Sequence, residues 1–431
     1  MQLLIKGGRI VDPSQNIDKV SDLLIRDGKI AKIGEIDPSG FSCDEIVDAA
    51  GLVVTPGLID MHVHFREPGF EQKEDIRSGA TAAAVGGFTS VAAMPNTSPV
   101  TSTRAVVEFV AAQGKAAGLS KVYPIGAMTK DLKGEEMAEI GDMIAGGAVA
   151  FSDDAFPIAN AGLMRKVMEY CSMLDAPVIL HCEDKSLADD GLMNEGLLAT
   201  TLGLRGIPDE AEEVSISRNI AIANLAECGM HVAHVSTKGS VEIIRRAKAD
   251  GMKITCETCP QYFSLTEESV LGYDTNAKIN PPLRTAEDVS AIKAGLADGT
   301  IDVIATDHAP HAIEEKEVEF AYAPCGMVGL ETSVGLVLTE LVETGVLTLN
   351  EAIRKMSAVP ARILGIDGGT LQVGKSADVT IIDLSREYVV DPSKFHSKSK
   401  NSPLGGRKLK GVPVLTIVDG RVVARDGEAA I

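Results

Sequence analysis

The sequence predicts an α/β fold: a (β/α)₈ TIM-type barrel with a small β-sandwich domain formed by both chain ends. Three observations support this prediction. Between residues 58 and 306, eight short apolar segments alternate with segments whose apolar residues recur at helical spacing. The two chain ends instead carry short strands punctuated by glycine and proline. A chain of 431 residues is also long enough to bury one large core and a second, smaller one.

The predicted barrel strands are largely apolar, as expected for parallel strands that are covered by helices. They span residues 58–62, 88–93, 122–127, 148–152, 177–181, 230–235, 253–257 and 301–306. Helices are expected between them at 103–116, 134–145, 162–174, 209–227, 239–249 and 286–297. The alternative is a doubly wound open sheet, which would place its ligands at one switch point rather than around a ring.

Each chain end has too few strands for a stable sandwich of its own. The N-terminal end predicts strands at 3–10, 21–26, 29–33 and 45–48, and the C-terminal end at 377–384, 412–419 and 421–424. The economical prediction is one antiparallel β domain assembled from both ends. We therefore expect residues 1–52 and 365–431 to form the two parts of this domain, and residues 53–364 to form the barrel.

Composition excludes several classes of protein. The net charge is −20 and no basic block offsets it, which argues against binding to nucleic acid or to an anionic membrane surface. No segment has the roughly 20 consecutive apolar residues that span a bilayer. The seven cysteines are odd in number and scattered, which is typical of reduced thiols. We expect a soluble cytoplasmic protein that acts on a small molecule.

Histidines and aspartates follow the predicted barrel strands at their C-terminal ends, where barrel enzymes place their active sites. An isolated His-X-His pair is usually an incidental surface feature, but here further candidate ligands occur at matching positions. The candidates are His62 and His64 at the end of the first strand, Asp153 and Asp154 at the end of the fourth, His181 at the end of the fifth, His234 in the sixth and Asp307 after the eighth. Imidazole and carboxylate groups that converge on one rim predict a divalent metal site, most commonly a zinc site.

The chemistry that such a site suggests is the hydrolysis of an amide or its reversal. Zinc lowers the pKa of bound water to about 7, and two ions can share one hydroxide. His62 and His64 would hold one ion, and His181 and His234 the other, with a carboxylate from the fourth strand between them. Asp307 is then placed to move a proton between the water and the leaving nitrogen, although a lone aspartate is more often a helix cap or an ion-pair partner.

Five sequence blocks together resemble the amidohydrolases of the cyclic-amide branch, and within them the class I dihydroorotases. The blocks are HVHFREPG at 62–69, MPNT at 94–97, HCED at 181–184, INPPLR at 279–284 and ATDHAPH at 305–311. The resemblance covers nearly the whole chain. It implies the reversible, zinc-dependent cyclisation of N-carbamoyl-L-aspartate to L-dihydroorotate in de novo pyrimidine (UMP) biosynthesis.

The resemblance also implies roles for individual residues. The implied zinc ligands are His62, His64, Asp154, His181, His234 and Asp307, with one or two ions per subunit and two expected; Asp307 is also the implied catalytic acid/base. The groups implied to bind substrate are His64, Arg66, Asn96, Asn280, His311, Cys325 and Gly326, of which Arg66, Asn96 and His311 would hold the exocyclic carboxylate. Many relatives bridge their metals with a carboxylated lysine, but residues 148–157 contain no lysine. An aspartate must serve instead, and the choice between Asp153 and Asp154 stays open.

Two other functions compete with this interpretation. One is another cyclic amidase, such as a hydantoinase or an allantoinase; Arg66, Asn96 and His311 and the missing lysine favour dihydroorotate. The other is a non-catalytic homologue that only scaffolds aspartate carbamoyltransferase, and the complete ligand set argues against it. Association with aspartate carbamoyltransferase and a homo-oligomer, namely a dimer, are further expectations.

Several other features are expected to be structural. Residues 369–376 match the phosphate-loop pattern, but a strand rather than a helix is predicted to follow, so we expect a turn. Cys256 and Cys259 lack a second cysteine pair and are interpreted as incidental thiols. His231 is interpreted as a packing or surface residue, and His396 as a residue without a partner. The segment 310–326 is expected to act as a lid over the site.

Overall fold

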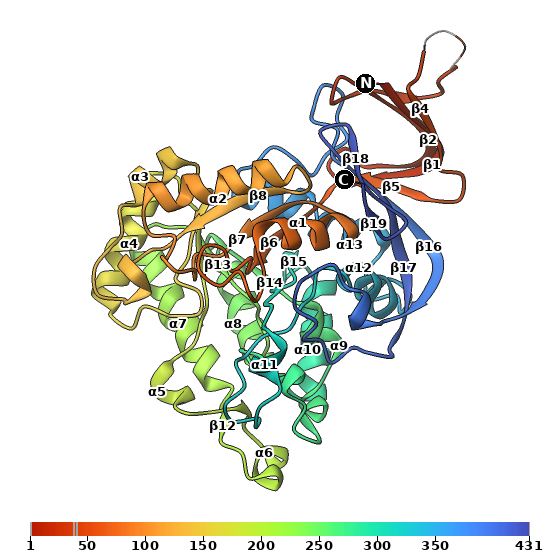
Figure 1. Ribbon diagram of the computed structural model, residues 1–431. Helices are drawn as coiled ribbons and strands as arrows, with labels where there is room; N and C mark the ends of the chain where they lie inside the picture. Colours follow the sequence, from red (N-terminus) through yellow and green to blue (C-terminus); the bar gives the residue numbers. More distant parts are fainter. Residues whose placement is uncertain (1, 38, 40–41, 431) are drawn as a thin grey trace.

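The computed structural model describes residues 2–37, 39 and 42–430. Eight parallel strands form the barrel in chain order (Figure 1). They are β6 (Leu58–Val63), β7 (Phe88–Ala93), β8 (Lys121–Gly126), β9 (Ala150–Phe151), β10 (Val178–Leu180), β13 (Met230–Val232), β14 (Ile254–Thr258) and β15 (Val303–Ile304). The parallel bridge between Val63 and His308 joins the first strand to the segment after the last one. The predicted barrel is confirmed, because a doubly wound sheet would reverse its strand order.

Helices surround the barrel as the alternating pattern predicts (Figure 1). The longer ones are α1 (Ile76–Val85), α2 (Arg104–Ala117), α4 (Ala161–Met173), α7 (Glu210–Leu225), α8 (Lys238–Ala249) and α10 (Ala286–Ala297). The shorter ones are α3 (Ile140–Gly146), α5 (Lys185–Ala188), α6 (Leu197–Leu202), α9 (Pro260–Ser264), α11 (Ile313–Lys316), α12 (Ser333–Val337), α13 (Leu349–Lys355) and α14 (Ala358–Leu364). Single turns lie at η2 (Lys130–Leu132), η3 (Glu267–Val270), η4 (Thr275–Ala277), η5 (Leu338–Val342) and η6 (Pro392–Lys394).

One helix begins later than predicted. The sequence pattern places a helix at 134–145, but α3 begins only at Ile140. The preceding residues form a turn in which Lys130 N–H donates to the carbonyl of Glu136, and Thr129 forms a bridge with Met137. These contacts use backbone groups that a helix would need for its first turn.

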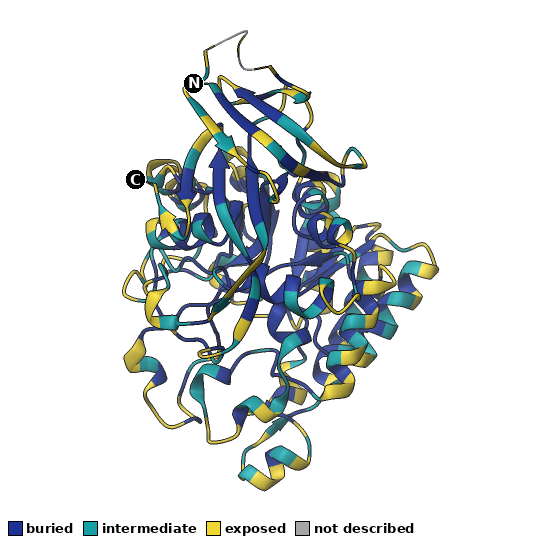
Figure 2. Ribbon diagram, turned by 90° about the vertical axis from the view of Figure 1, so that its right-hand side faces the viewer, coloured by how far each residue is buried: buried dark blue, intermediate teal, exposed yellow. Residues whose placement is uncertain are grey.

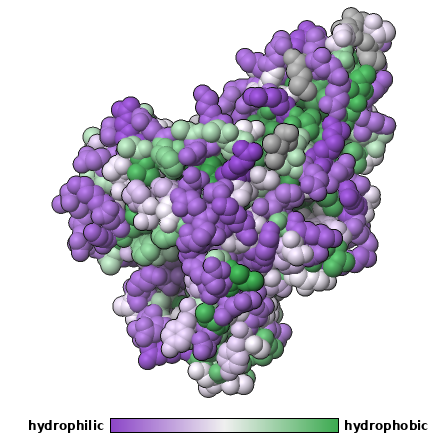
Figure 3. Space-filling view, viewed as in Figure 1, coloured by the Kyte–Doolittle hydropathy of each residue, from purple (hydrophilic) through white to green (hydrophobic). Residues whose placement is uncertain are grey.

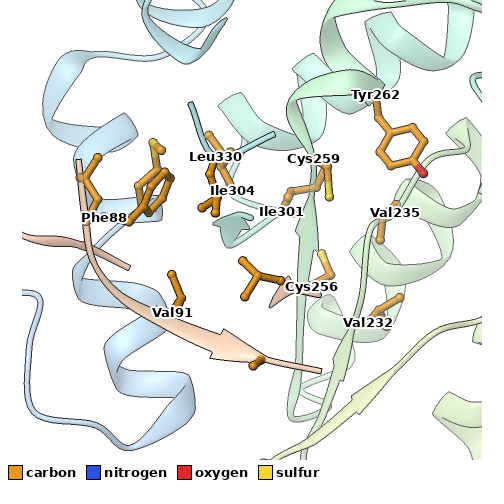
Figure 4. Close-up of a cluster of buried hydrophobic side chains, with 14 of the residues drawn as sticks. Phe88, Val91, Val232, Val235, Cys256, Cys259, Tyr262, Ile301, Ile304 and Leu330 are labelled. Carbon is orange, nitrogen blue, oxygen red and sulfur yellow. The ribbon is translucent and has the colours of Figure 1, made fainter. Parts of the chain in front are cut away.

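Two separate apolar clusters flank the barrel wall. The outer cluster packs helices against strands and includes the residues labelled in Figure 4, among them Cys256 and Cys259, which are buried free thiols as expected. The inner cluster holds residues from strands all around the barrel, such as Ile59, Ala92, Ile125, Ala150, Ile179 and Val303. Because neighbouring residues of a strand point to opposite faces, the two clusters mark the outside and the inside of the barrel.

The two chain ends form one nine-stranded sheet in the order β19-β18-β17-β16-β5-β1-β2-β3, with β4 beside β1. Its strands are β1 (Gln2–Asp12), β2 (Ile17–Arg26), β3 (Lys29–Gly34), β4 (Glu45–Asp48), β5 (Val53–Pro56), β16 (Val379–Val389), β17 (Lys408–Val418), β18 (Arg421–Arg425) and β19 (Glu428–Ala429). The predicted β domain built from both ends is therefore confirmed. β11 (Met193–Asn194) and β12 (Gly206–Ile207) form a separate small sheet.

The terminal sheet differs from the expectation in two respects. It is not wholly antiparallel, because β1 pairs in parallel with both β4 and β5. In addition, β5 pairs with β1 and β16, although the expected boundary assigned its residues to the barrel. That boundary stays a prediction.

The two parts of the terminal sheet share one apolar core. Leu3 and Leu23 from the first part share a cluster with Val379 and Leu415 from the second part. Residues 369–376 enter this sheet as a turn, in which Gly374 N–H donates to the carbonyl of Ile30. β16 follows this turn, so the phosphate-loop pattern does not open a helix here, as predicted.

The burial pattern matches these cores (Figure 2), with buried residues along the strands and exposed ones on the outer helix faces. The face in Figure 3 is largely hydrophilic, with apolar residues in separate small patches. Among the described residues, no helix has the length and apolar character needed to cross a bilayer.

Candidate metal centre and active site

Two groups of three potential metal ligands lie at the C-terminal end of the barrel strands. The first consists of His62, His64 and Asp154, and the second of Asp154, His181 and His234. Within each group the candidate ligand atoms all lie within 4.8 Å of one another, and all five residues are buried. The groups share Asp154, so one carboxylate lies between two clusters of imidazoles.

The geometry separates the two adjacent aspartates. Asp154 Oδ1 lies 3.5 Å from His181 Nδ1 and 3.4 Å from His234 Nε2, and its Oδ2 lies 3.5 Å from His64 Nε2. Asp153 instead accepts hydrogen bonds from the backbone N–H groups of Met128 and Thr129 at 2.7 and 3.0 Å. The carboxylate between the imidazoles is therefore that of Asp154, whereas Asp153 fixes the backbone that follows β8.

The residues of this site fit a divalent cation. His62 Nε2 is buried and has no hydrogen-bond partner, although it lies 3.5 Å from Asp307 Oδ1 and 3.7 Å from Asp154 Oδ2. Burial alone would raise the pKa of Asp154, but His62 and the hydrogen bonds of the neighbouring histidines hold it well below its ordinary value. An ionised carboxylate among buried imidazole nitrogens, one of which has no hydrogen-bond partner, is the donor set that zinc prefers.

Asp307 reaches the same site from the segment after β15. Its Oδ1 lies 3.1 Å from His64 Nε2. The preceding residue, Thr306, donates its backbone N–H at 3.1 Å and its hydroxyl at 2.5 Å to the carboxylate of Asp60. Asp60 also accepts from the backbone N–H of His62, so one buried carboxylate ties the strand ends that carry His62 and Asp307 together.

Arg66, Asn96 and His311 lie beside these ligand groups. Arg66 Nη2 is 3.4 Å from His311 Nε2, and Asn96 Oδ1 is 2.9 Å from His64 Nδ1. Burial lowers the pKa of Arg66 to about 10, so that it remains a cation at neutral pH. Among the ion pairs of the described residues none includes Arg66, which leaves this charge available for an anionic ligand.

His311 carries no charge near neutral pH. Burial, together with the positive charge of Arg66, lowers its pKa to about 2. Its Nε2 lies 2.9 Å from the carbonyl of Cys325, which accepts the hydrogen bond. His311 can therefore take part in hydrogen bonding without adding charge to the site.

The remaining candidates for substrate binding are already engaged within the protein. Asn280 Nδ2 donates to Glu183 Oε2 at 3.3 Å. Gly326 N–H donates to the carbonyl of Lys278 at 2.9 Å, and the carbonyl of Cys325 accepts from His311. In this conformation these backbone groups hold the segment 310–326 in place, so they would have to exchange partners to bind a ring amide.

Two buried carboxylates contact the candidate ligand histidines but were not among the predicted site residues. Glu257 Oε1 accepts from His62 Nδ1 at 2.6 Å, and Glu183 Oε2 accepts from His181 Nε2 at 3.3 Å. Each lies on the side of its imidazole that faces away from the ligand group. For Glu257 the signal in the sequence was a glutamate inside an apolar barrel strand, because such a residue is seldom buried without a partner. Glu183 lies in the segment after β10, where a glutamate is no such signal.

Three further histidines have structural partners, and the expectation that His396 lacks a partner was wrong. His231 is buried and contacts Glu257 Oε2 at 3.2 Å, so of the two expected alternatives it is a packing residue, with a hydrogen bond. His396 Nδ1 lies 3.0 Å from Glu331 Oε2 and thus has a partner. His308 contacts Glu74 at 3.3 Å.

Comparisons with known proteins identify the family. Residues 51–240 match the model of dihydro-orotase-like proteins, and residues 271–424 match that of the amidohydrolase family. A dihydroorotase from Pelotomaculum thermopropionicum is 58% identical over 99% of both chains, and one from Geotalea daltonii is 55% identical over 98% of this chain and 99% of its own.

Solved structures agree with this result. L-Hydantoinase (dihydropyrimidinase) from Arthrobacter aurescens is 30% identical, with a TM-score of 0.89 over 100% of this chain and 97% of its own. Dihydropyrimidinase from Brevibacillus agri, at 24% identity and a TM-score of 0.86, shares the fold. The barrel, the two ligand groups at its C-terminal rim and the similarity over the full length lead to one conclusion: this chain belongs to the dihydroorotase family of the amidohydrolases.

Proposed function

We propose that this protein is a dihydroorotase, which catalyses the reversible cyclisation of N-carbamoyl-L-aspartate to L-dihydroorotate in pyrimidine biosynthesis. The observation that carries this proposal is the half-buried Arg66, which forms no ion pair with the other described residues, beside the two ligand groups that share Asp154. A guanidinium that forms no ion pair with the other described residues suits the exocyclic carboxylate of dihydroorotate, which neutral hydantoin and allantoin rings lack. The 58% identical dihydroorotase of Pelotomaculum thermopropionicum supports the same activity.

We further propose that the site holds two zinc ions. His62, His64 and Asp154 would hold one, and Asp154, His181 and His234 the other. Asp307 would complete the set, since its Oδ1 lies within 3.5 Å of His62 Nε2 and 3.1 Å of His64 Nε2. When bound, zinc supplies Lewis acidity for the reacting carbonyl and for water.

The protein's own residues would orient the substrate and move the proton. Arg66 would bind the carboxylate through its guanidinium, with Asn96 and neutral His311 as hydrogen-bonding neighbours. Asp307 would take a proton from water during ring opening and deliver it to the ring nitrogen, and the reverse transfer would accompany ring closure. Asn280 and the backbone at Cys325 and Gly326 would hold the ring amides after a rearrangement of the segment 310–326.

We expect a cytoplasmic homodimer that acts on this small molecule. Association with aspartate carbamoyltransferase remains a prediction. Sedimentation of the purified chain alone would measure the dimer, and sedimentation of its mixture with aspartate carbamoyltransferase would measure the association.

Turnover of three substrates tests the proposal. We expect kcat/KM for L-dihydroorotate to exceed that for hydantoin and for allantoin, because only dihydroorotate presents a carboxylate to Arg66. Replacing Arg66 by methionine should lower kcat/KM for dihydroorotate by about 100-fold, since a charge-assisted hydrogen bond contributes roughly 1.5–3 kcal/mol. Faster turnover of hydantoin by the wild-type chain would favour the second candidate, a hydantoinase, which the TM-score of 0.89 to L-hydantoinase keeps open.

A further inference from the structure

On β13 and β14 the inner face of the barrel carries polar residues. Other strands place apolar residues such as Ile59 and Ile179 in the inner cluster. In β14, Cys256 belongs to the outer cluster, so the alternate residues Thr255 and Glu257 lie on the inner face. Glu257 is 0% exposed, and a buried carboxylate is costly unless hydrogen bonds and charges compensate it. Its place in an apolar barrel therefore needs an explanation.

A chain of hydrogen bonds runs from these residues to the metal centre. His62 Nδ1 lies 2.6 Å from Glu257 Oε1, and His231 Nε2 lies 3.2 Å from Glu257 Oε2. At the outer end, His231 Nδ1 lies 2.8 Å from Thr255 Oγ1. An ionised carboxylate can only accept, so both imidazole nitrogens that face Glu257 carry hydrogen. His231 Nδ1 then accepts from the Thr255 hydroxyl, and every polar group of the chain is satisfied.

This arrangement determines which nitrogen of His62 is free. With hydrogen on Nδ1, the Nε2 atom of the neutral imidazole carries a lone pair, and Nε2 is the buried atom that lacks a hydrogen-bond partner. It points toward Asp154 and Asp307. A carboxylate behind a metal-binding histidine fixes its tautomer and ring orientation and raises its basicity.

We propose that Thr255, His231 and Glu257 form a positioning chain that holds His62 with Nε2 ready to bind the ion it shares with His64 and Asp154. This inference rests on the proposed metal site. None of the three residues contacts that ion; each acts through the next. The chain would explain why these three polar residues lie next to one another on β13 and β14.

The second ligand group has its own carboxylate on the opposite ring nitrogen. His181 Nε2 faces Glu183 Oε2 at 3.3 Å, so its Nδ1 faces His234 Nε2 at 2.8 Å. Glu183 also pairs with Lys185 and stands near the surface, whereas Glu257 is enclosed. Glu257 thus contacts a ligand of the first proposed ion, and Glu183 a ligand of the second. A variant of each carboxylate should therefore weaken the binding of a different Zn²⁺ ion.

The test measures Zn²⁺ affinity of the metal-free full-length protein by competition with a chromogenic chelator. We expect Glu257→Gln to weaken one of the two binding steps by about 10- to 100-fold, the range for partners behind metal ligands. Glu183→Gln should weaken the other step. Thr255→Val, which removes only the outermost hydrogen bond, should weaken the same step as Glu257→Gln by about 2- to 10-fold.

Glu331→Gln is the matched control, because Glu331 forms a carboxylate–histidine pair with His396, outside the ligand groups. It should leave both binding steps unchanged. Equal weakening of both steps by Glu257→Gln, or unchanged Zn²⁺ affinity in a folded Glu257→Gln protein, would overturn the positioning chain. If Glu257→Gln does not fold, Thr255→Val decides, and unchanged affinity there overturns it. Because the readout is metal binding, wild-type protein that binds Zn²⁺ but does not turn over dihydroorotate contradicts the proposed function alone.

Discussion

Asp153 and Asp154 are neighbours in the sequence, but their carboxylates have unrelated surroundings. Asp154 lies among four histidines, whereas Asp153 accepts from two backbone N–H groups after β8. Asp154 is therefore a candidate metal ligand, whereas the adjacent Asp153 holds the backbone in place.

Alanine variants should separate metal binding by Asp154 from stabilisation of the backbone by Asp153. We expect Asp154→Ala to lose bound zinc and to lower kcat by about 100-fold or more, because both ligand groups lose their shared carboxylate. Asp153→Ala should keep its zinc but lower the free energy of unfolding by about 2–4 kcal/mol, since the N–H groups of Met128 and Thr129 are left buried without acceptors. Metal content by atomic absorption and unfolding in urea measure the two effects. Loss of zinc from folded Asp153→Ala would contradict this assignment.

The sequence could predict the candidate ligands but not the choice between the two aspartates. His62 lies near the end of β6, and His181 and His234 lie just after β10 and β13. Parallel strands of a barrel bring their C-terminal ends to one rim. Asp153 and Asp154 lie in a turn, where the alternation that orients strand side chains no longer holds. Glu257 was missed for a different reason: its partners, His62 and His231, come from distant strands, so its compensation is visible only in three dimensions.

At the level of elements, the segment 310–326 contains α11 and borders the site through His311. Two buried lysines anchor it to neighbouring backbone. Lys316 Nζ donates to the carbonyls of Thr275 and Pro324 at 2.9 and 2.7 Å, and Lys278 Nζ donates to those of Phe320 and Ala321 at 2.7 and 3.0 Å. Burial lowers the pKa of Lys316 to about 8. The expected lid is thus held by ammonium groups and carbonyls.

Removing one anchor should loosen the lid. We expect Lys316→Met to raise KM for dihydroorotate by about 3- to 10-fold, because hydrogen bonds from a charged donor to the loop are lost. Limited proteolysis should cut this variant faster between residues 313 and 323. Lys238→Met, which removes an exposed lysine paired with Glu287, serves as the control. Unchanged KM and unchanged proteolysis in Lys316→Met would show that the segment is not a lid.

Most elements were predictable because their patterns are local. The strands of the barrel are short apolar runs, and α10 spans the very residues that its periodicity predicts. The residues before α3 also have apolar residues at helical spacing, but the turn that they form depends on contacts between Thr129 and Met137. The parallel pairing of β1 with β4 and β5 depends likewise on the path of the chain between them, which a strand's own residues do not encode.

At the scale of the whole molecule, one lysine links the barrel to the terminal sheet. Lys121, at the start of β8, pairs with Asp378 just before β16 at 2.7 Å, and with Asp419 between β17 and β18 at 2.8 Å. Burial by itself would lower the pKa of Lys121, but the two carboxylates outweigh it and raise the pKa above 10.5. The side chain of Asp378 is only 4% exposed, so this carboxylate depends on the lysine for its charge partner.

This pair predicts a defined pH dependence of stability. Because the pKa of Lys121 is raised in the folded protein, its contribution is fully present below the unfolded value of 10.5 and is lost as pH rises through the folded value. At pH 7, Lys121→Met should lower the free energy of unfolding by about 1–3 kcal/mol, because the carboxylate of Asp378 stays buried without its charged partner. The difference between the two proteins should shrink above pH 10.5. Lys130→Met, which breaks an exposed pair with Glu136, should change stability by less than about 1 kcal/mol. Urea unfolding at pH 7 and above pH 10.5 measures these differences, and an equal loss at both would show that Lys121 acts through packing rather than through its charge.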